Sequence, residues 1–393
     1  MKAEPAGAIL SGPAAPPNVL ARRGGDRSYR PGLDPRRAFD DWKAGIKARI
    51  GLDFGIEYNA IGYVATDSLG DDGAASGVFR IPGVWSLVNR DGPNTGRLSF
   101  TVGHRHAYSD VAPSAFGDEL GYIGVLNTSF NDQGWRVTHL YWDQHFAEDR
   151  AVAYVGWLDT TDFVDVYALA SAWTGFANLV FENGSGAIGG LPDGALGAMV
   201  GGFLSDRIYA VASITDANGD PTDIGGGFDT FFNDFETLKT FEIGWTAGPK
   251  QLFTDNIHLT VWQIDERDAT GASDGAGIAG SLSHVIDGSW MPFLRGAWAH
   301  DGGTLYEASV SVGLGYSRNP GRDVLGIGLN WSRPNRDTFG ADLDDQYTLE
   351  LFQRWQVTEG LQMTPSLQII KDPALNPDRD LIAVFGLRVR AEL

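Results

Sequence analysis

From residue 45 onward the chain consists of short segments in which apolar and polar residues alternate. A period of two places successive side chains on opposite faces of a β-strand, so each segment has one apolar and one polar face. At about 3.4 Å per residue and a tilt of about 45°, roughly ten residues cross the hydrocarbon core of a bilayer. The alternation predicts about sixteen such strands, near residues 45–58, 79–90, 96–107, 134–146, 150–158, 195–203, 207–215, 237–247, 255–265, 277–286, 290–300, 305–316, 322–332, 345–356, 361–370 and 381–393.

The connections between these segments also alternate in length. Those after even-numbered strands are mostly short, as at 147–149 and 204–206, whereas several after odd-numbered strands are long, as at 59–78 and 216–236. Short periplasmic turns, long external loops and an even strand count are typical of an outer-membrane barrel. A soluble β-sandwich or propeller would explain the alternation of residues but not the alternation of loop lengths, and we find no blade repeat of about 40 residues. We therefore expect an all-β fold, a transmembrane antiparallel β-barrel of about sixteen strands over residues 45–393.

The first 44 residues have a different pattern and are expected to lie outside the barrel. Residues 1–33 are rich in Pro, Ala, Gly and Arg without any period, which predicts a flexible periplasmic leader. Asp34 and Pro35 are typical of a helix start and predict a short helix over 36–43. The first residues contain no apolar segment with a cleavage site, so we expect that a signal peptide has been removed or replaced by an initiator Met.

The composition favours a barrel over a helical fold. The 393 residues include 52 Gly, 12 Trp, 12 Tyr and 21 Phe but only 4 Met, which suits tight turns and aromatic belts. Mean hydropathy is -0.16 although hydrophobic residues make up 43% of the chain, so apolar residues are interleaved with polar ones. No run of about 18 apolar residues is present to form a membrane-spanning helix. A closed barrel is the other structure that satisfies every backbone group in lipid.

Charge and residue types argue against several classes of function. The net charge of -20 argues against a nucleic-acid partner. The absence of Cys excludes disulfides, thiolate catalysis and Cys-based zinc sites. Residues 275–280 fit the GxGxxG pattern but open a period-two segment rather than a βαβ unit, and the acidic stretch 216–223 breaks the EF-hand pattern. We therefore expect no catalytic residue, no metal and no cofactor.

Charged residues on the polar faces of the strands are the candidates for contact with a solute. Arg388 and Arg390 alternate with Leu387 and Val389 in the last strand. They must face the lumen, because Arg or Lys on the lipid face near the midplane would cost about 2–4 kcal/mol. Facing arginines and carboxylates offer donors and acceptors to hydroxyl groups, and the alternative is that they only hold the barrel wall rigid. The predicted pore-lining residues are Lys47, Arg49, Asp53, Glu57, Arg97, Arg105, Glu242, His258, Arg295, Glu307, Glu350, Arg354, Arg388 and Arg390.

The long connection 159–194 is the candidate for a constriction. It is apolar and aromatic enough to fold inward and pack within the barrel, and its constriction-loop candidates are Phe163, Tyr167, Trp173 and Phe176. The alternative is an external loop packed over the rim.

Two stretches resemble a known family. One is the hairpin from Tyr141 to Arg150 and on through 155–163, where an aromatic strand containing Gln turns back into a segment that ends in Asp-Phe. The other comprises 364–370, Asp372-Pro373 and 385–390. Together with the helix before the first strand, these stretches resemble the carbohydrate-selective porin family (the OprB type). The chain departs from the family at Trp157, where Arg or Lys is usual, and at its last residue, Leu393 in place of Phe or Trp.

The resemblance implies a sixteen-stranded porin of the bacterial outer membrane that admits glucose and other sugars and acts as a monomer. We accordingly expect passive diffusion of mono- and small oligosaccharides or similar small polar solutes, with outer-membrane lipid around the barrel and no enzymatic activity; a trimer is the alternative assembly. A general or anion-biased diffusion porin is the first alternative function. A plugged barrel that acts as an enzyme or adhesin is the second.

Overall fold

The computed structural model describes residues 10–22, 35–90, 92–318 and 322–393. Within these ranges the helices are α1 (Pro16–Arg22), α2 (Pro35–Ile50), α3 (Phe116–Leu120), α4 (Ile224–Asp229) and α5 (Arg336–Phe339). The strands are β1 (Leu52–Phe54), β2 (Glu57–Ala65), β3 (Gly73–Val88), β4 (Gly96–Ala107), β5 (Gly134–Phe146), β6 (Ala151–Leu158), β7 (Ala195–Phe203), β8 (Ile208–Asp216), β9 (Thr237–Thr246), β10 (Asn256–Ile264), β11 (Gly275–Ser283), β12 (Trp290–Asp301), β13 (Tyr306–Tyr316), β14 (Val324–Pro334), β15 (Gln346–Thr358), β16 (Leu361–Lys371) and β17 (Leu381–Glu392). Among the described helices, none is both long and apolar enough to cross a membrane.

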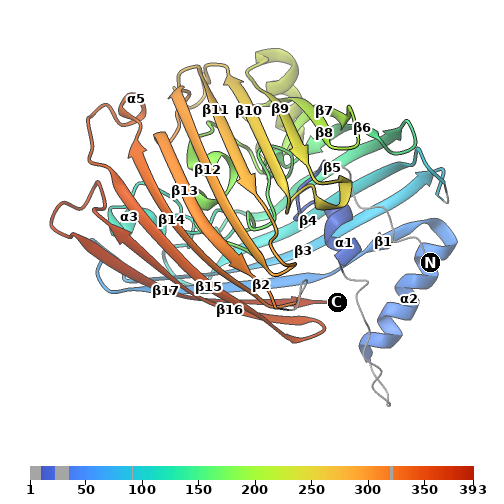
Figure 1. Cartoon of the computed structure of the whole chain (residues 1–393), viewed down its shortest axis with the longest axis horizontal. Coiled ribbons are helices and arrows are strands. Elements are labelled where there is room, and N and C mark those ends of the chain that lie inside the picture. Colours follow the sequence, from blue (N-terminus) through green and yellow to red (C-terminus); the bar gives the residue numbers. More distant parts are fainter. Residues whose placement is uncertain (1–9, 23–34, 91, 319–321) are drawn as a thin grey trace.

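Strands β2 to β17 form one closed antiparallel ring (Figure 1). Each strand pairs with its neighbours along the chain, and β17 closes the ring on β2, with Val384 opposite Ala65 and Glu392 opposite Glu57. The closure is extended by backbone hydrogen bonds in both directions between Ile56 and Leu393. The short β1 is an additional strand that pairs with β3. This architecture confirms the predicted sixteen-stranded transmembrane barrel.

The predicted alternation of faces is clear in β10. Asn256, His258 and Thr260 point inward and are buried, whereas Ile257 and Leu259 point outward and are exposed. In water such an outer surface would be unfavourable, but lipid solvates apolar side chains. Exposed aromatic side chains lie near both ends of the outer surface. Those at the short-turn end are Trp85, Trp245, Trp290 and Trp355, and those at the long-loop end are Trp135, Trp298 and Tyr347. Two such belts are typical of a membrane barrel.

Short and long connections lie at opposite ends of the barrel. The turns 147–150 and 204–207 are at the same end as the last residue and α2, whereas the loops 108–133, 159–194 and 217–236 start from the other end. By the usual pattern of outer-membrane barrels, the short-turn end faces the periplasm.

The predicted first strand, 45–58, is wrong. The helix α2 continues to Ile50 and takes up the first part of this segment. The first strand of the ring is β2, which lies mostly within what the alternation assigned to an external loop, 59–78. Lys47, Ala48 and Arg49 are good helix formers, and the part of the alternation that lies in the helix, 46–50, is too short to separate a strand from a helix face. Gly51 ends the helix with a left-handed φ of 79°, a conformation that glycine adopts without strain.

Part of the predicted flexible leader is also corrected. Residues 10–22 lie inside the barrel, where α1 contacts β3 and β4 (Figure 1) and Leu10, Ala15 and Val19 are buried. These contacts are tertiary and leave no periodic signal in the sequence. Residues 1–9 and 23–34, including the expected helix cap Asp34, lie outside the described residues.

Candidate constriction site

The connection between β6 and β7, residues 159–194, folds back into the barrel and is called the constriction loop below. Asp159 starts the inward turn by accepting hydrogen bonds from the Thr161 backbone N–H (3.1 Å) and hydroxyl (2.6 Å). Further along, the Val180 carbonyl accepts from Ser311 Oγ of β13 (2.6 Å), and the Gly175 carbonyl accepts from Arg388 Nη2 of β17 (2.9 Å). Contacts with inward-facing side chains on different sides of the ring place the loop within the lumen.

Asp165 is the main acidic anchor of the constriction loop. Its carboxylate pairs with Arg295 of β12 and accepts a hydrogen bond from His258 Nε2 of β10 (2.7 Å). Burial raises the pKa of Asp165, but Arg295 and His258 outweigh burial and hold the pKa below its ordinary value. On the same side, Glu242 accepts from the Asp165 backbone N–H (3.0 Å). The loop is therefore held by an ionised network that is closed to solvent.

A second set of anchors comes from β15. Glu350 accepts from the backbone N–H groups of Ala177 (2.8 Å) and Asn178 (3.0 Å). Arg354 donates to the Thr174 carbonyl (2.9 Å). These partners are backbone groups of a stretch of loop that lies outside any helix or strand. The charged side chains therefore supply the hydrogen bonds that this backbone would otherwise lack.

Aromatic packing completes the attachment of the loop. Phe176 lies 4.7 Å from Phe181, 5.6 Å from Phe293 of β12 and 5.0 Å from Phe352 of β15, measured between ring centroids. The Tyr167 ring lies beneath the Arg295 guanidinium at 4.2 Å. The loop thus fills the sector of the lumen bounded by β10 to β15.

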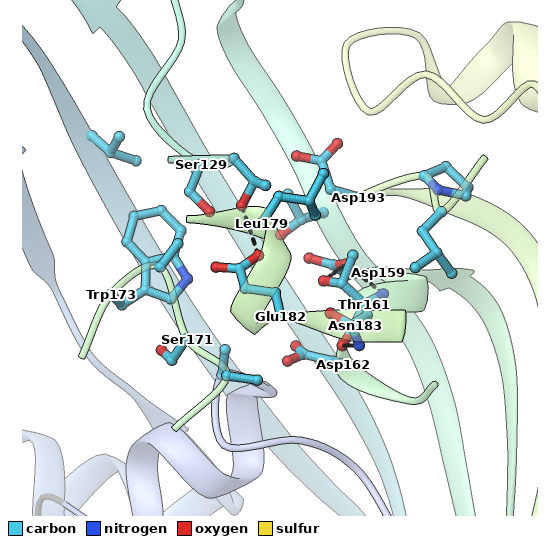
Figure 2. Close-up of a pocket in the computed structure, with 18 of the residues that line it drawn as sticks. Ser129, Asp159, Thr161, Asp162, Ser171, Trp173, Leu179, Glu182, Asn183 and Asp193 are labelled. Carbon is cyan, nitrogen blue, oxygen red and sulfur yellow. Dashed lines mark hydrogen bonds between the residues drawn. The ribbon is translucent and has the colours of Figure 1, made fainter. Parts of the chain in front are cut away.

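A cavity of about 380 Å³ remains in the other sector, between the constriction loop and the wall formed by β3, β4 and β5 (Figure 2). The polar side chains that line it include Arg80, Thr101, Arg105, Arg136 and Thr138 on the wall, Thr128, Ser129, Asn131 and Gln133 before β5, and Asp159, Thr161, Asp162, Ser171, Glu182, Asn183 and Asp193 on the loop. Trp173 contributes an aromatic face. Cations on the wall therefore face carboxylates on the loop across a small space.

Ion pairs fix the positions of the wall arginines. Arg105 Nη2 lies 2.8 Å from Asp193 Oδ2, and Arg136 pairs with the other oxygen of the same carboxylate. Arg80 pairs with Glu57 at 3.4 Å and its guanidinium lies 4.4 Å from the Trp173 ring centroid. Each arginine is thus held in one orientation before a solute arrives.

Four buried polar atoms of the cavity residues have no hydrogen-bond partner within the described part of the chain. They are Thr101 Oγ1, Arg105 Nη1, Arg136 Nε and Glu182 Oε1. An unsatisfied buried donor or acceptor costs about 1–3 kcal/mol. Groups of this kind favour a solute that brings both donors and acceptors, as a hydroxyl does.

The loop carboxyls do not all ionise in the ordinary range. Burial raises the pKa of Glu182 to about 8, and burial together with the nearby Asp162 raises the pKa of Asp159 to about 6. Near neutral pH Glu182 is mostly protonated and can donate as well as accept a hydrogen bond.

Among the described residues, His139, Asp159 and Asp162 bring possible metal-ligand atoms within 4.8 Å of one another. His139 Nε2 and Asp162 Oδ2 lie 3.0 Å apart, at hydrogen-bonding distance. Asp162 thus has a partner in His139, and Asp159 accepts hydrogen bonds from Thr161.

The structure divides the predicted pore-lining residues into three groups. Those that hold the constriction loop are Glu242, His258, Arg295, Glu350, Arg354 and Arg388. Arg105 lines the cavity, Glu57 pairs with Arg80 and Arg390, and Arg97 pairs with Asp143. Of the constriction-loop candidates, Trp173 lines the cavity, whereas Phe163, Tyr167 and Phe176 are buried in apolar clusters.

The remaining predicted residues lie elsewhere. Lys47 and Arg49 are on α2 and not on a lumen-facing strand, because the helix extends to Ile50, and Asp53 in β1 pairs with Lys47 at 2.6 Å. Glu307 lies at a β-bulge at the long-loop end of β13. The wrong strand prediction for 45–58 explains the first three of these misplacements.

Sequence reasoning missed several residues of the cavity. Arg80 lies between Phe79 and Ile81, and Arg136 between Trp135 and Val137, so the alternation itself could have identified both arginines. No local signal marks Asp159, Asp162, Glu182 or Asp193, because the loop brings them to the wall through tertiary contacts.

Comparisons with known proteins agree with this geometry. Residues 280–393 match the model of the family described as carbohydrate-selective porin, OprB family, which confirms the resemblance inferred from sequence. The high-pH structure of Pseudomonas putida OprB superimposes with a TM-score of 0.72 at 16% identity, covering 90% of this chain and 97% of that one. Its low-pH structure gives a TM-score of 0.53 at 11% identity, covering 94% and 100%. A Rhodopseudomonas blastica porin carrying three substitutions also gives 0.53, at 14% identity and covering 87% and 100%. No curated protein matches the chain.

Proposed function

We propose that the chain is an outer-membrane channel for sugars. Its last six strands have the sequence pattern of the OprB family of carbohydrate-selective porins, and the whole barrel has the porin fold. Solute would move passively down its gradient through the cavity beside the constriction loop. The family and the fold point to a channel rather than an enzyme. We also propose that the barrel works as a monomer, without a cofactor and without catalytic activity.

The observation that carries the proposal is the chemistry of the cavity. A pyranose has hydroxyls around its edge and apolar C–H faces. Arg105, Arg136 and Glu182 hold unsatisfied donors and acceptors for the hydroxyls, while Trp173 offers a flat face for the ring. A channel selects by such lining groups and by its width, without tight binding.

The balance of charge disfavours the anion-biased alternative. The cavity contains three arginines, Arg80, Arg105 and Arg136, but also four carboxyl groups on the loop side. With Glu182 mostly protonated near neutral pH, the formal charges of the cavity nearly cancel. A neutral polyol gains hydrogen bonds in this setting, whereas a dicarboxylate gains no net attraction.

Liposome swelling with isotonic glucose, sucrose and succinate tests the proposal. We expect faster swelling with glucose than with succinate, and reversal potentials in a KCl gradient that show little preference for either ion. Equal rates for glucose and succinate would instead support a general diffusion porin. No conductance in a planar bilayer would contradict every porin assignment.

The double variant Arg105→Gln/Arg136→Gln links the proposal to the cavity. Removing both guanidiniums leaves Asp193 unpaired and removes donors, so we expect glucose flux to fall by about tenfold. Arg150→Gln is the matched control, because Arg150 lies at an exposed turn and pairs with exposed Asp206. Liposomes with the control should swell like those with the unaltered chain. If the control also lost glucose flux, the loss in the double variant could not be attributed to the cavity.

A further inference from the structure

Residues 10–22, called the N-terminal segment below, occupy the lumen beside the cavity. The segment crosses from the β7–β8 side of the ring, where Leu10 is anchored, to β3 and β4, where α1 packs. Ala15 is fully buried and Val19 is 3% exposed. A chain end that only passed by the barrel would keep such side chains in solvent.

Leu10 is the apolar anchor of the segment. It lies in a cluster with Tyr209, Val211 and Leu252, and is 4% exposed. The wall leaves space for it, because a Cβ on Gly201 of β7 would approach Leu10 Cδ1 to 2.7 Å. Tyr209 and Gly201 lie next to the turn 204–207, so the anchor is at the periplasmic end of the barrel.

The segment is also bonded to the constriction loop. The Gly12 backbone N–H donates to the Asp162 carbonyl. A Cβ on Gly12 would lie 3.0 Å from both that oxygen and Val166 Cγ1, so the two backbones approach more closely than a side chain allows. Asn18 Nδ2 donates to the carbonyls of Ser11 (2.8 Å) and Gly12 (3.0 Å), which fixes the turn that leads into α1.

These contacts place the segment on the route of the solute. Ala14 lines the cavity, and α1 covers β3 and β4, the two strands that carry Arg80 and Arg105. Figure 1 shows α1 toward the end of the barrel that carries α2 and the C-terminus, so the segment lies between the cavity and the periplasmic end of the same sector. We propose that the N-terminal segment is a resident plug that narrows the periplasmic exit of the cavity and sets the largest sugar that can pass. This inference rests on the proposed function as a sugar channel.

The residence of the segment can be tested without any transport, since the chain has no cysteine. Ser11→Cys would be treated with a membrane-impermeant methanethiosulfonate reagent in the folded full-length chain. Ser11 is fully buried, so we expect labelling to be slower than at Ser205→Cys, in the exposed turn 204–207, by about a hundredfold. Adding Leu10→Asp should speed the labelling of Ser11→Cys, because a carboxylate cannot remain in the apolar cluster. If Ser11→Cys and Ser205→Cys were labelled at similar rates in the chain that keeps Leu10, the proposal would be overturned.

Restriction by the segment is tested by flux. Leu10→Asp and a variant that lacks residues 1–22 should raise single-channel conductance at least about twofold and admit a trisaccharide that the unaltered chain excludes. Leu10→Met is the control, since it conserves volume and apolar character and should leave both properties unchanged. Heat-modifiable migration in gels would show that each variant forms a barrel. If the unaltered chain transports sugars but both variants have the same conductance and the same size limit, the plug is refuted and the function as a porin stands. If neither the unaltered chain nor the variants transport sugars, the proposed function itself fails.

Discussion

Glu182 is the side chain whose protonation most directly changes the cavity. Burial raises its pKa to about 8, and its Oε2 accepts a hydrogen bond from Thr128 Oγ1 at 3.1 Å while Oε1 stays without a partner in the described chain. The carboxyl is therefore neutral below pH 8 and becomes an anion above it. Asp159 has a pKa of about 6 and completes most of its ionisation before Glu182 begins.

The ion selectivity of the channel should consequently depend on pH. As pH rises from about 7 to about 9, the cavity gains one negative charge at Glu182, and the permeability ratio of K⁺ to Cl⁻ should rise. Reversal potentials in a KCl gradient measure this ratio. Glu182→Gln should remove the rise, whereas Glu148→Gln at an exposed turn should keep it. A pH-independent ratio in the unaltered chain would contradict the assigned pKa.

A second residue-scale prediction concerns the anchor at Asp165. Arg295→Met leaves a buried carboxylate without its main cation, and breaking a buried ion pair in this way costs about 3–5 kcal/mol. We expect a lower free energy of unfolding in urea and noisier single-channel current, because the constriction loop loosens. The double variant Asp165→Asn/Arg295→Met should recover part of the stability. Full stability of Arg295→Met alone would show that the pair does not hold the loop.

At the scale of elements, the boundary between α2 and β1 depends on one residue. Gly51 has a φ of 79°, and a Cβ there would lie 2.5 Å from the Ser86 carbonyl oxygen. Gly45, inside the same helix, has no atom within 4 Å of an added Cβ. The two glycines therefore form a matched pair for substitution.

Alanine at these two positions should have opposite effects. Gly51→Ala should destabilise the folded chain by about 1 kcal/mol or more, through strain and the clash with Ser86. Gly45→Ala should stabilise α2 by about 0.5–1 kcal/mol. Urea unfolding and the rate of proteolysis within α2 measure both effects. Equal behaviour of the two variants would contradict the assigned end of the helix.

The strands were predictable because lipid and lumen impose a period of two on almost every one of them, as β10 and β17 illustrate. The segment at 45–58 was not, because its alternating residues 46–50 also fit one turn of a helix, and nothing in the local pattern shows that Gly51 ends that helix. Arg80 and Arg136 could have been found by the same alternation that identified Arg105. The carboxyls of the constriction loop and the position of Leu10 depend on tertiary contacts, which no local pattern encodes.

For the whole molecule, the sequence indicated a membrane barrel with polar residues inside, and the structure adds how that interior is used. Most inward charges, such as Arg295 and Glu350, hold the constriction loop and do not line the cavity. The loop fills the sector bounded by β10 to β15, and the N-terminal segment occupies part of the rest. A cavity of about 380 Å³ remains against β3, β4 and β5, and this cavity is where selectivity for a solute can arise.

The most direct test of this account is whether sugar passes through that cavity. Ser129 lines it, whereas Ser68 lies in an exposed external loop, and each can be replaced by Cys in a chain with no native cysteine. Glucose flux into liposomes would be measured before and after reaction with a bulky methanethiosulfonate reagent. We predict a fall of at least about fivefold for Ser129→Cys and no change for Ser68→Cys. Unchanged flux through fully labelled Ser129→Cys would contradict the account, since the solute would then have another route.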